Sequence, residues 1–397
     1  MVDFMGETRA AFDTVVSCRR ALHQCPELSG QEVHTSERVA STLESFGIQV
    51  QRGVGTPYLG VTGVLTGERP GPTVALRADM DALPVTEVKD LPYRSQIPGV
   101  MHACGHDAHM AMLLGAAQLL AEHREELAGN VKFIFEPNEE REGGALSMIA
   151  DGALDGVDAI FGLHVDPEFP TGTIVTKPGA VMASSDWLTI DLCGESTHGG
   201  YPHRGVDAIV IAGEFLSAVQ SLVSRNLDPT ESAVITFGSI HGGTARNVIC
   251  GQVRLEGILR ALDPEVRRYL LDRIQGMLEG ITKAYGGTFR FHRRDSQTVT
   301  QNTPSMASFV KQTAKEVLGE TAFLPLPTAR LRSEPFARYL ERVPGAYYFL
   351  GTGNPQKDTQ HPWHSAEFDI DEEAMVYGTA MQAALAYRYL QQGSAPR

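Results

Sequence analysis

Cysteine is scarce in this chain of 397 residues: there are five, an odd number at scattered positions, which argues against a disulfide framework. Long apolar runs are absent as well, and none approaches the ~20 residues that span a bilayer. The first residues lack the apolar segment and small-residue cleavage site of a secretory signal. We therefore expect a cytoplasmic protein with no membrane partner.

Positive charge is also in deficit. The net charge is −14, and no basic cluster stands out along the chain. A surface of this sign repels phosphate backbones, so we expect no nucleic-acid partner. The apolar content of 42% and the charged content of 21% are ordinary for a globular protein. The length is enough for two or three domains, each with a core of its own.

Several common catalytic motifs are missing. The chain has no G-x-S-x-G elbow, no Walker-type loop and no G-x-G-x-x-G in a strand-to-helix turn. The sequence thus gives no sign of a serine hydrolase of the α/β type or of a nucleotide-binding protein.

Predicted strands and helices alternate through the first part of the chain. Apolar or β-branched runs at 58–65, 73–77 and 132–135 predict buried strands, and the pattern AHMAMLLGAAQLLAEH at 108–123 predicts a helix. This alternation is typical of a layered α/β domain.

The rhythm changes at about residue 186. From there the predicted order is β-α-β-β-α-β, typical of a small α+β sandwich with helices on one face. We expect this smaller domain, residues 186–296, to be inserted into a larger discontinuous one made of residues 1–185 and 297–397.

The densest chemical feature is the run MHACGHDAH at 101–109. Thiolate and imidazole are good ligands for zinc-like ions. Cys104 and His106 reach one point only through a local turn, which Gly105 can supply. The alternative is a chance cluster in a loop.

A second feature is FIFEPNEE at 133–140, where a predicted strand leads into a loop with two adjacent acids. One of Glu139 and Glu140 could bind metal while the other takes a proton from water. The alternative is a solvated acidic turn.

Three further segments fit the same chemistry. His164 ends an apolar run, and His364 precedes an acidic helix start, although either histidine alone is more often structural. The run LRADMDALP ends a predicted strand with Asp79 and Asp81, which suit the orientation of a metal-bound histidine or, alternatively, a strand-end cap. Such loops after strands meet at one edge of an α/β sheet.

Taken in order, these segments resemble the M20 metallopeptidase family, above all its aminoacylase-type branch of N-acyl-amino-acid amidohydrolases, hippurate hydrolases and auxin-conjugate hydrolases. The matching stretches span nearly the whole chain: RRALHQCPELSGQE at 19–32, LRADMDALP at 76–84, MHACGHDAHMAMLLGAA at 101–117, NEE at 138–140, GLH at 162–164, THGGYPHRGVDAI at 197–209, GGTARNVI at 242–249, VPGAYYFLGTG at 343–353 and HSAEFDIDEEA at 364–374.

The resemblance implies a zinc-peptidase-like α/β catalytic domain with an inserted lid and dimerisation domain. It also implies two divalent ions per subunit, held by the positions matching Cys104, His106, Glu140, His164 and His364. Zinc, manganese, cobalt and nickel all suit such ligands, so the metal stays open.

Further roles follow from the same resemblance. Glu139 matches the general base and Asp81 the residue that orients the site. His198 matches a histidine that polarises the scissile carbonyl in the partner subunit of a homodimer or dimer-based oligomer. Asn247 and Arg260 match positions that hold the substrate carboxylate.

The implied reaction is hydrolysis of the amide bond of N-acyl amino acids by a metal-bridging hydroxide. Two positions depart from the family's usual G-S-E-D-F: Arg332 replaces a small residue and Pro335 an acid. Arg332 either binds an acidic substrate group or is an exposed loop arginine. A specialised deacylase or dipeptidase of a biosynthetic or detoxification pathway is therefore the alternative, and a non-catalytic binding protein on the same fold is a third.

Overall fold

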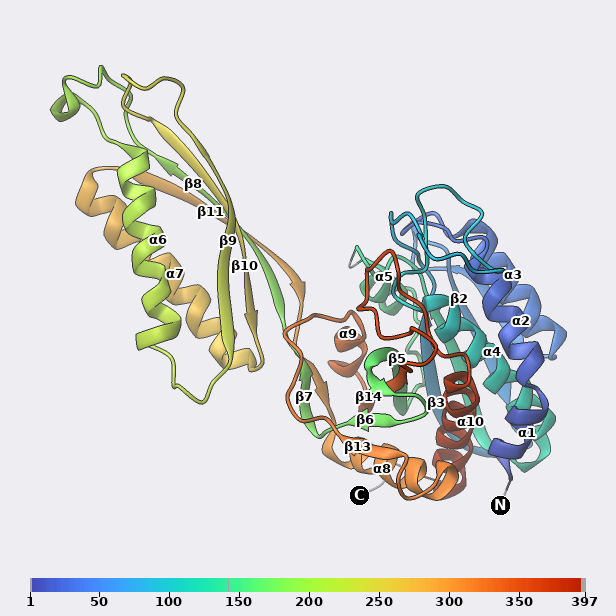
Figure 1. Cartoon of the computed structure of the whole chain (residues 1–397). Helices are drawn as coiled ribbons and strands as arrows, with labels where there is room; N and C mark the ends of the chain where they lie inside the picture. Colours follow the sequence, from blue (N-terminus) through green and yellow to red (C-terminus); the bar gives the residue numbers. More distant parts are fainter. Residues whose placement is uncertain (1, 142, 394–397) are drawn as a thin grey trace. The chain divides into compact units, whose positions relative to one another are not determined.

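The computed structural model describes residues 2–141 and 143–393 and divides into two units (Figure 1). Unit 1 comprises the chain up to Val181, Gln301–Pro327 and the chain from Pro335. Unit 2 comprises Met182–Thr300 and Thr328–Glu334. The short second segment of unit 2 was expected in the larger domain. It belongs to unit 2 because the amide of Ala183 donates to the carbonyls of Arg330 and Arg332, at 3.0 and 2.8 Å.

Unit 1 is built on an eight-stranded mixed sheet with the order β1-β2-β4-β3-β5-β14-β6-β13. Its strands are β1 (Gln49–Val54), β2 (Gly60–Thr66), β3 (Arg69–Asp79), β4 (Ala128–Glu136), β5 (Ala159–Pro170), β6 (Ile174–Thr176), β13 (Phe323–Pro325) and β14 (Gly345–Gly353). The central strands β4, β3, β5 and β14 run parallel, so their carboxyl ends meet at one edge.

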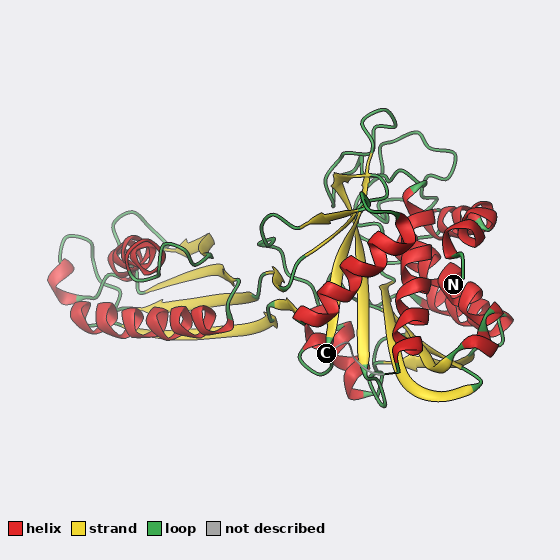
Figure 2. Cartoon of the chain, turned by 90° about the horizontal axis from the view of Figure 1, so that it is seen from below, coloured by secondary structure: helices red, strands yellow, loops and turns green. Residues whose placement is uncertain are grey.

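Helices cover both faces of this sheet (Figure 2). They are α1 (Phe4–Ala10), α2 (Phe12–His23), α3 (Val33–Ser45), α4 (His106–Glu122), α5 (Gly144–Ala150), α8 (Pro304–Leu318), α9 (Phe336–Leu340) and α10 (Ala374–Gln392). Neighbouring residues of β5 show the two faces, because side chains alternate along a strand. Phe161 contacts Phe309 of α8, whereas a Cβ on Gly162 would lie 2.7 Å from the ring of Phe336 of α9.

Unit 2 is a four-stranded antiparallel sheet with the order β11-β8-β10-β9, packed against two helices. Its elements are β8 (Ser185–Cys193), α6 (Ala208–Arg225), β9 (Ala233–Gly242), β10 (Gln252–Ala261), α7 (Pro264–Tyr285) and β11 (Thr288–Gln297). By length and composition α6 could cross a membrane. Its residues Ile211, Phe215 and Val219 are nevertheless fully buried in the core of unit 2. The α/β fold class and the β-α-β-β-α-β order of the smaller part are confirmed.

Candidate metal centre

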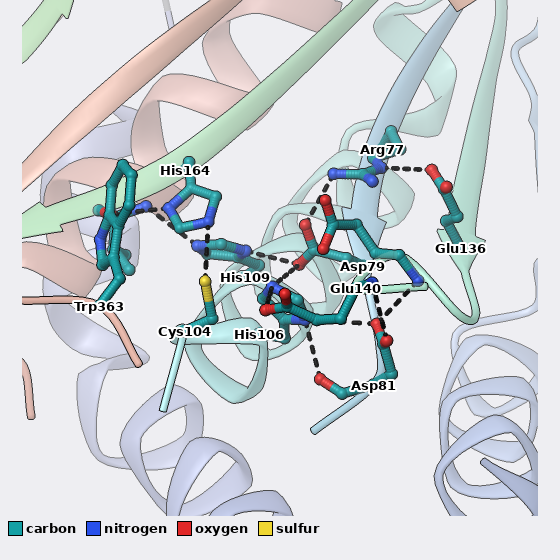
Figure 3. Close-up of polar contacts among 12 residues, drawn as sticks. Arg77, Asp79, Asp81, Cys104, His106, His109, Glu136, Glu140, His164 and Trp363 are labelled. Carbon is teal, nitrogen blue, oxygen red and sulfur yellow. Dashed lines mark hydrogen bonds and ion pairs between the residues drawn. The ribbon is translucent and has the colours of Figure 1, made fainter. Parts of the chain in front are cut away.

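Several acidic residues and histidines of unit 1 gather at the carboxyl edge of three neighbouring parallel strands (Figure 3). Asp79 ends β3 and Glu136 ends β4, and the loops that follow carry Asp81 and Glu140. His164 lies on β5 beside them. The crevice beyond the carboxyl ends of such strands is the common ligand site of α/β sheets.

The start of α4 brings in two more ligand types. Gly105 caps the helix with φ of +87°, and an added Cβ would lie 2.4 Å from Cγ2 of Val165. This left-handed backbone, which glycine adopts at no steric cost, turns Cys104 and His106 toward one region. The predicted turn is thus present.

Two groups of potential ligands share one thiol. Cys104, His106 and His164 form one group, and Cys104, Glu140 and His364 form the other. Within each group the ligand atoms lie within 4.8 Å of one another. The Sγ of Cys104 is 3.4 Å from Nε2 of His164, and Glu140 Oε1 is 3.3 Å from Nε2 of His364. All five predicted ligands therefore lie together.

Two buried atoms face this space without a hydrogen bond. The Nδ1–H of His106 donates to the carbonyl of Asp81 at 2.8 Å, so Nε2 is the ring nitrogen left to bind a cation, whether a proton or a metal ion. Nε2 of His106 and Oε1 of Glu140 lie 3.9 Å apart, and neither has a hydrogen-bond partner among the described residues. Two acceptors of this kind are satisfied by a cation, so the residues fit a metal ion.

The charges around the site also favour a cation. Burial alone lowers the pKa of His106, but the negative charges of Asp79 and Asp81 outweigh it and raise the pKa to about 10. Burial raises the pKa of the Cys104 thiol well above its usual range, and the charges of Glu140 and Glu139 add to this. A thiolate at this position thus needs a positive neighbour.

Asp81 holds the acidic loop in place. Its carboxylate accepts hydrogen bonds from the backbone amides of Glu139 and Glu140, both at 3.0 Å, and from the hydroxyl of Ser29 at 2.6 Å. Burial raises the pKa of Asp81, but the hydrogen bond and charge of His106 outweigh it and hold the pKa below its usual value. Asp81 therefore holds the backbone of both glutamates, and its role in the reaction stays a prediction.

His364 approaches from a loop with unusual backbone geometry. Its φ is +66°, and its amide donates to the carbonyl of Ala103 at 2.8 Å. The preceding Trp363 lies over His164, with ring centroids 4.5 Å apart. His361, three residues earlier, pairs with Asp358 at 3.0 Å and belongs to no ligand group of the described chain.

The remaining predicted residues belong to unit 2 and lie there in two separate groups, His198 with Asn247 and Arg260 with the 328–334 segment. The loops of His198 and Asn247 meet, because the amide of Gly199 donates to the carbonyl of Asn247 at 2.7 Å. This contact lies beyond the first residue of β10, Gln252, whereas Arg260 is next to its last residue. Arg260 lies eight residues after Gln252 along the strand, a separation of about 27 Å.

Arg260 contacts the 328–334 segment, which contains Arg332, one of the two departures from the family's usual sequence. Its guanidinium donates to the hydroxyl of Ser333 at 2.8 Å. Arg332, the next residue back, is exposed. The structure brings Arg260 and the 328–334 segment together and leaves the roles of both as predictions.

Sequence reasoning missed some residues of the site. Ser29 and Trp363 give no signal in a single sequence, because each contacts the site through a residue far along the chain. Arg77 does give one: a charged residue inside an apolar strand that is buried on both faces needs a partner. Its partners include Asp79 at 2.7 Å and Glu136 at 2.8 Å.

Known proteins were compared with this chain and its structure. A sequence profile described as Peptidase family M20/M25/M40 matches residues 75–388. Thermostable carboxypeptidase 1 of Saccharolobus solfataricus is 38% identical, over 97% of this chain and 97% of that protein. N-acetylcysteine deacetylase of Bacillus subtilis is 38% identical, over 95% and 97%. A solved dinuclear metal-binding peptidase of the M20 family from Bacillus subtilis is 34% identical with a TM-score of 0.85, over 96% of this chain and 99% of that one.

Proposed function

The chain belongs to peptidase family M20/M25/M40, and from this premise we propose that it hydrolyses the amide bond of N-acyl amino acids. Membership makes it a metal-dependent amidohydrolase. The substrate class is what the proposal adds, supported by a relative named as an N-acetylcysteine deacetylase. A cytoplasmic location belongs to the same proposal.

The observation that carries the proposal is the pair of ligand groups that share Cys104. We assign the binding of two divalent ions to Cys104, His106, Glu140, His164 and His364. When bound, such ions polarise an amide carbonyl and lower the pKa of a water molecule. The choice among zinc, manganese, cobalt and nickel stays open, because these ligand types accept all of them.

Glu139 is the proposed general base. Its side chain is 9% exposed, and it forms a group with Asp81 and His106 at the edge of the site. In this role the carboxylate takes a proton from the attacking water and returns it to the amine nitrogen as the C–N bond breaks. Asp81 fixes the position of the base through the backbone amide of Glu139.

The residues of unit 2 supply the rest of the proposal. Asn247 and Arg260 would bind the substrate carboxylate, and His198 would stabilise the oxyanion, a role worth about 10²–10³ in rate. The separation of His198 from Arg260 along β10 means that one copy of unit 2 does not bring both to one substrate. This supports a homodimer or dimer-based oligomer in which His198 and the neighbouring Asn247 serve the partner's site, where Asn247 meets the partner's Arg260.

A matched pair of variants tests the base. Glu139→Gln keeps the shape but cannot take a proton, so we expect kcat to fall roughly 10²–10⁴-fold with two ions still bound. Glu125→Gln is the control, because Glu125 is exposed and lies outside the ligand groups of the described residues. Wild-type turnover in the Glu139→Gln variant would remove Glu139 from its role.

A substrate panel separates the proposal from its alternative. The departures at Arg332 and Pro335, and a relative named as a carboxypeptidase, favour a specialised deacylase or dipeptidase as second candidate. Acetyl, benzoyl and long-chain acyl amino acids would be assayed beside dipeptides, with metal content measured in parallel. Turnover of simple acyl amino acids supports the proposal, whereas turnover of dipeptides alone supports the alternative.

A further inference from the structure

His109 lies in the first turn of α4, three residues after His106, and both face the site because residues three apart share a helix face. Its side chain is 1% exposed. Asp79, His106 and His109 are close enough to hold an ion as a group of their own. The hydrogen bonds of His109 decide whether it does.

Both ring nitrogens of His109 are occupied. Nδ1 lies 2.6 Å from Oδ1 of Asp79, and the backbone amide of Val165 donates to Nε2 at 2.9 Å. A carboxylate only accepts, so Nδ1 carries the proton, and an amide only donates, so Nε2 presents its lone pair. The ring is therefore the neutral Nδ1–H tautomer, and a second proton on Nε2 would face the amide hydrogen. Neither nitrogen is left for a metal ion.

The proton on Nδ1 is held there by a buried chain of charges (Figure 3). The other oxygen of Asp79 accepts from Arg77 at 2.7 Å, and Arg77 also donates to Glu136 at 2.8 Å. All three side chains are fully buried. Arg77 keeps Asp79 an acceptor, so Asp79 selects the tautomer of His109.

The Nε2 atom of His109 contacts β5, the strand that carries the predicted ligand His164. β3 pairs with β5 only as far as Gly162, so the amide of Val165 finds its acceptor in His109 instead of a strand. The carbonyl of Val165 in turn accepts from Nδ1 of His164 at 2.8 Å. That bond directs Nε2 of His164 toward Cys104. The ring centroids of His109 and His164 are 4.6 Å apart.

We propose that His109 is a positioning residue: as the neutral Nδ1–H tautomer it fixes the peptide of Val165 and thereby aims His164 into the metal centre. The proposal rests on the proposed function for the identity of the ligands, but it concerns metal binding and not the substrate. It assigns the Asp79–Arg77–Glu136 chain to the same task.

Two substitutions at His109 separate its two bonds. His109→Gln can still present an oxygen near the place of Nε2, and so can accept from Val165. His109→Asn can still donate to Asp79 near the place of Nδ1, but does not reach Val165. The measurement is metal content and the affinity of each ion, by competition with a chelator, using zinc or manganese alone. His123→Asn, at the far end of the same helix, is the control.

We expect two ions per subunit in every variant. Loss of a hydrogen bond that orients a ligand typically weakens metal binding about 10–100-fold, so we expect this loss for one ion in His109→Asn and a smaller loss in His109→Gln. The control should bind both ions like the wild type. One ion per subunit in both variants would make His109 a ligand, and wild-type affinities in both would leave it no positioning role; either result overturns the proposal.

A second variant covers the case in which the His109→Asn protein does not fold. Asp79→Asn removes the charge that selects the tautomer and should weaken the same ion, whereas unchanged affinities there would contradict the proposal. The metal-induced rise in melting temperature is recorded for each folded variant. A failure of the proposed function gives a different result. If the wild type binds two ions but cleaves no acyl amino acid, the proposed function is wrong and the positioning role of His109 still holds.

Discussion

Arg19 of α2 is fully buried, and its loss should destabilise unit 1 more than any single surface change. It donates to Asp107 at 2.8 Å, to Asp369 at 2.9 Å and to Glu372 at 3.1 Å. Burial lowers the pKa of Arg19, but the charges of Asp107 and Asp369 outweigh it and raise the pKa further above its ordinary value. Asp107 directly follows His106, so Arg19 also supports a segment of the metal centre.

The magnitude follows from what Arg19→Met would leave behind. Glu372 keeps Arg20 at 2.6 Å and Asp107 keeps His23 at 2.8 Å, whereas Asp369 keeps the hydroxyl of Tyr93 at 3.0 Å, so each of the three carboxylates retains a hydrogen-bond partner. Breaking a buried ion pair costs about 3–5 kcal/mol. The remaining partners place this variant near the lower end, about 3 kcal/mol. For a unit of this size that is a fall in melting temperature on the order of 6–12 °C.

The neighbouring arginine supplies the matched control. Arg20 lies on the same helix and binds the same Glu372, but its side chain is 45% exposed. Arg20→Met should therefore cost less than about 1 kcal/mol. Both variants would be compared by thermal and urea unfolding, with the transition of unit 1 followed separately from that of unit 2. Equal losses in the two variants would refute the reasoning that burial sets the size of the effect.

Other perturbations give further expected outcomes. Removing the bound ions with a chelator should abolish hydrolysis and lower the melting temperature, and added zinc or manganese should restore both. Hydrolysis that survives metal removal would contradict the assignment of a catalytic metal centre. Gly105→Ala should lower the free energy of unfolding by roughly 2–4 kcal/mol, because alanine is strained at φ of +87° and its Cβ would overlap Val165. A decrease of less than about 0.5 kcal/mol, measured by urea unfolding, would show that this turn relaxes without strain. Partial burial lowers the pKa of His123, but hydrogen bonds to Glu126 and Glu7 outweigh it and raise the pKa. The stabilisation is therefore complete below the unfolded pKa of about 6.5 and is lost as pH rises through the folded value. The wild type should be more stable than His123→Gln by up to about 0.5 kcal/mol near pH 5.5 and by less near pH 9. A stability difference that increases with pH would contradict a raised pKa of His123 in the folded protein.

Some elements were beyond prediction from local pattern. β1 went unpredicted because its residues, QVQRGV, are mostly exposed and polar, and an edge strand acquires its structure from pairing with β2. The three-residue strands β6 and β13 carry too few residues for a period-2 signal and form through pairing, β13 with β6 and β6 also with β14. The long helices were evident for two reasons: α7 buries one continuous face, whereas α4 is a run of strong helix formers that is buried on almost all sides.

The sequence by itself determined the chemistry that unit 1 can support. The residue types and their spacing indicated metal-binding loops, two adjacent acids at 139–140 and a turn at Gly105, because ligand preference and glycine's backbone freedom are properties of single residues. The set of five ligands came from the resemblance to the M20 family. Only the tertiary structure decided how they are used. It made Cys104 common to both ligand groups, and it occupied both nitrogens of His109, the histidine whose sequence position is as suggestive as that of His106. It also set His198 and Arg260 at opposite ends of one strand. The physical reason is that a hydrogen bond depends on which atoms the fold brings within about 3 Å of each other.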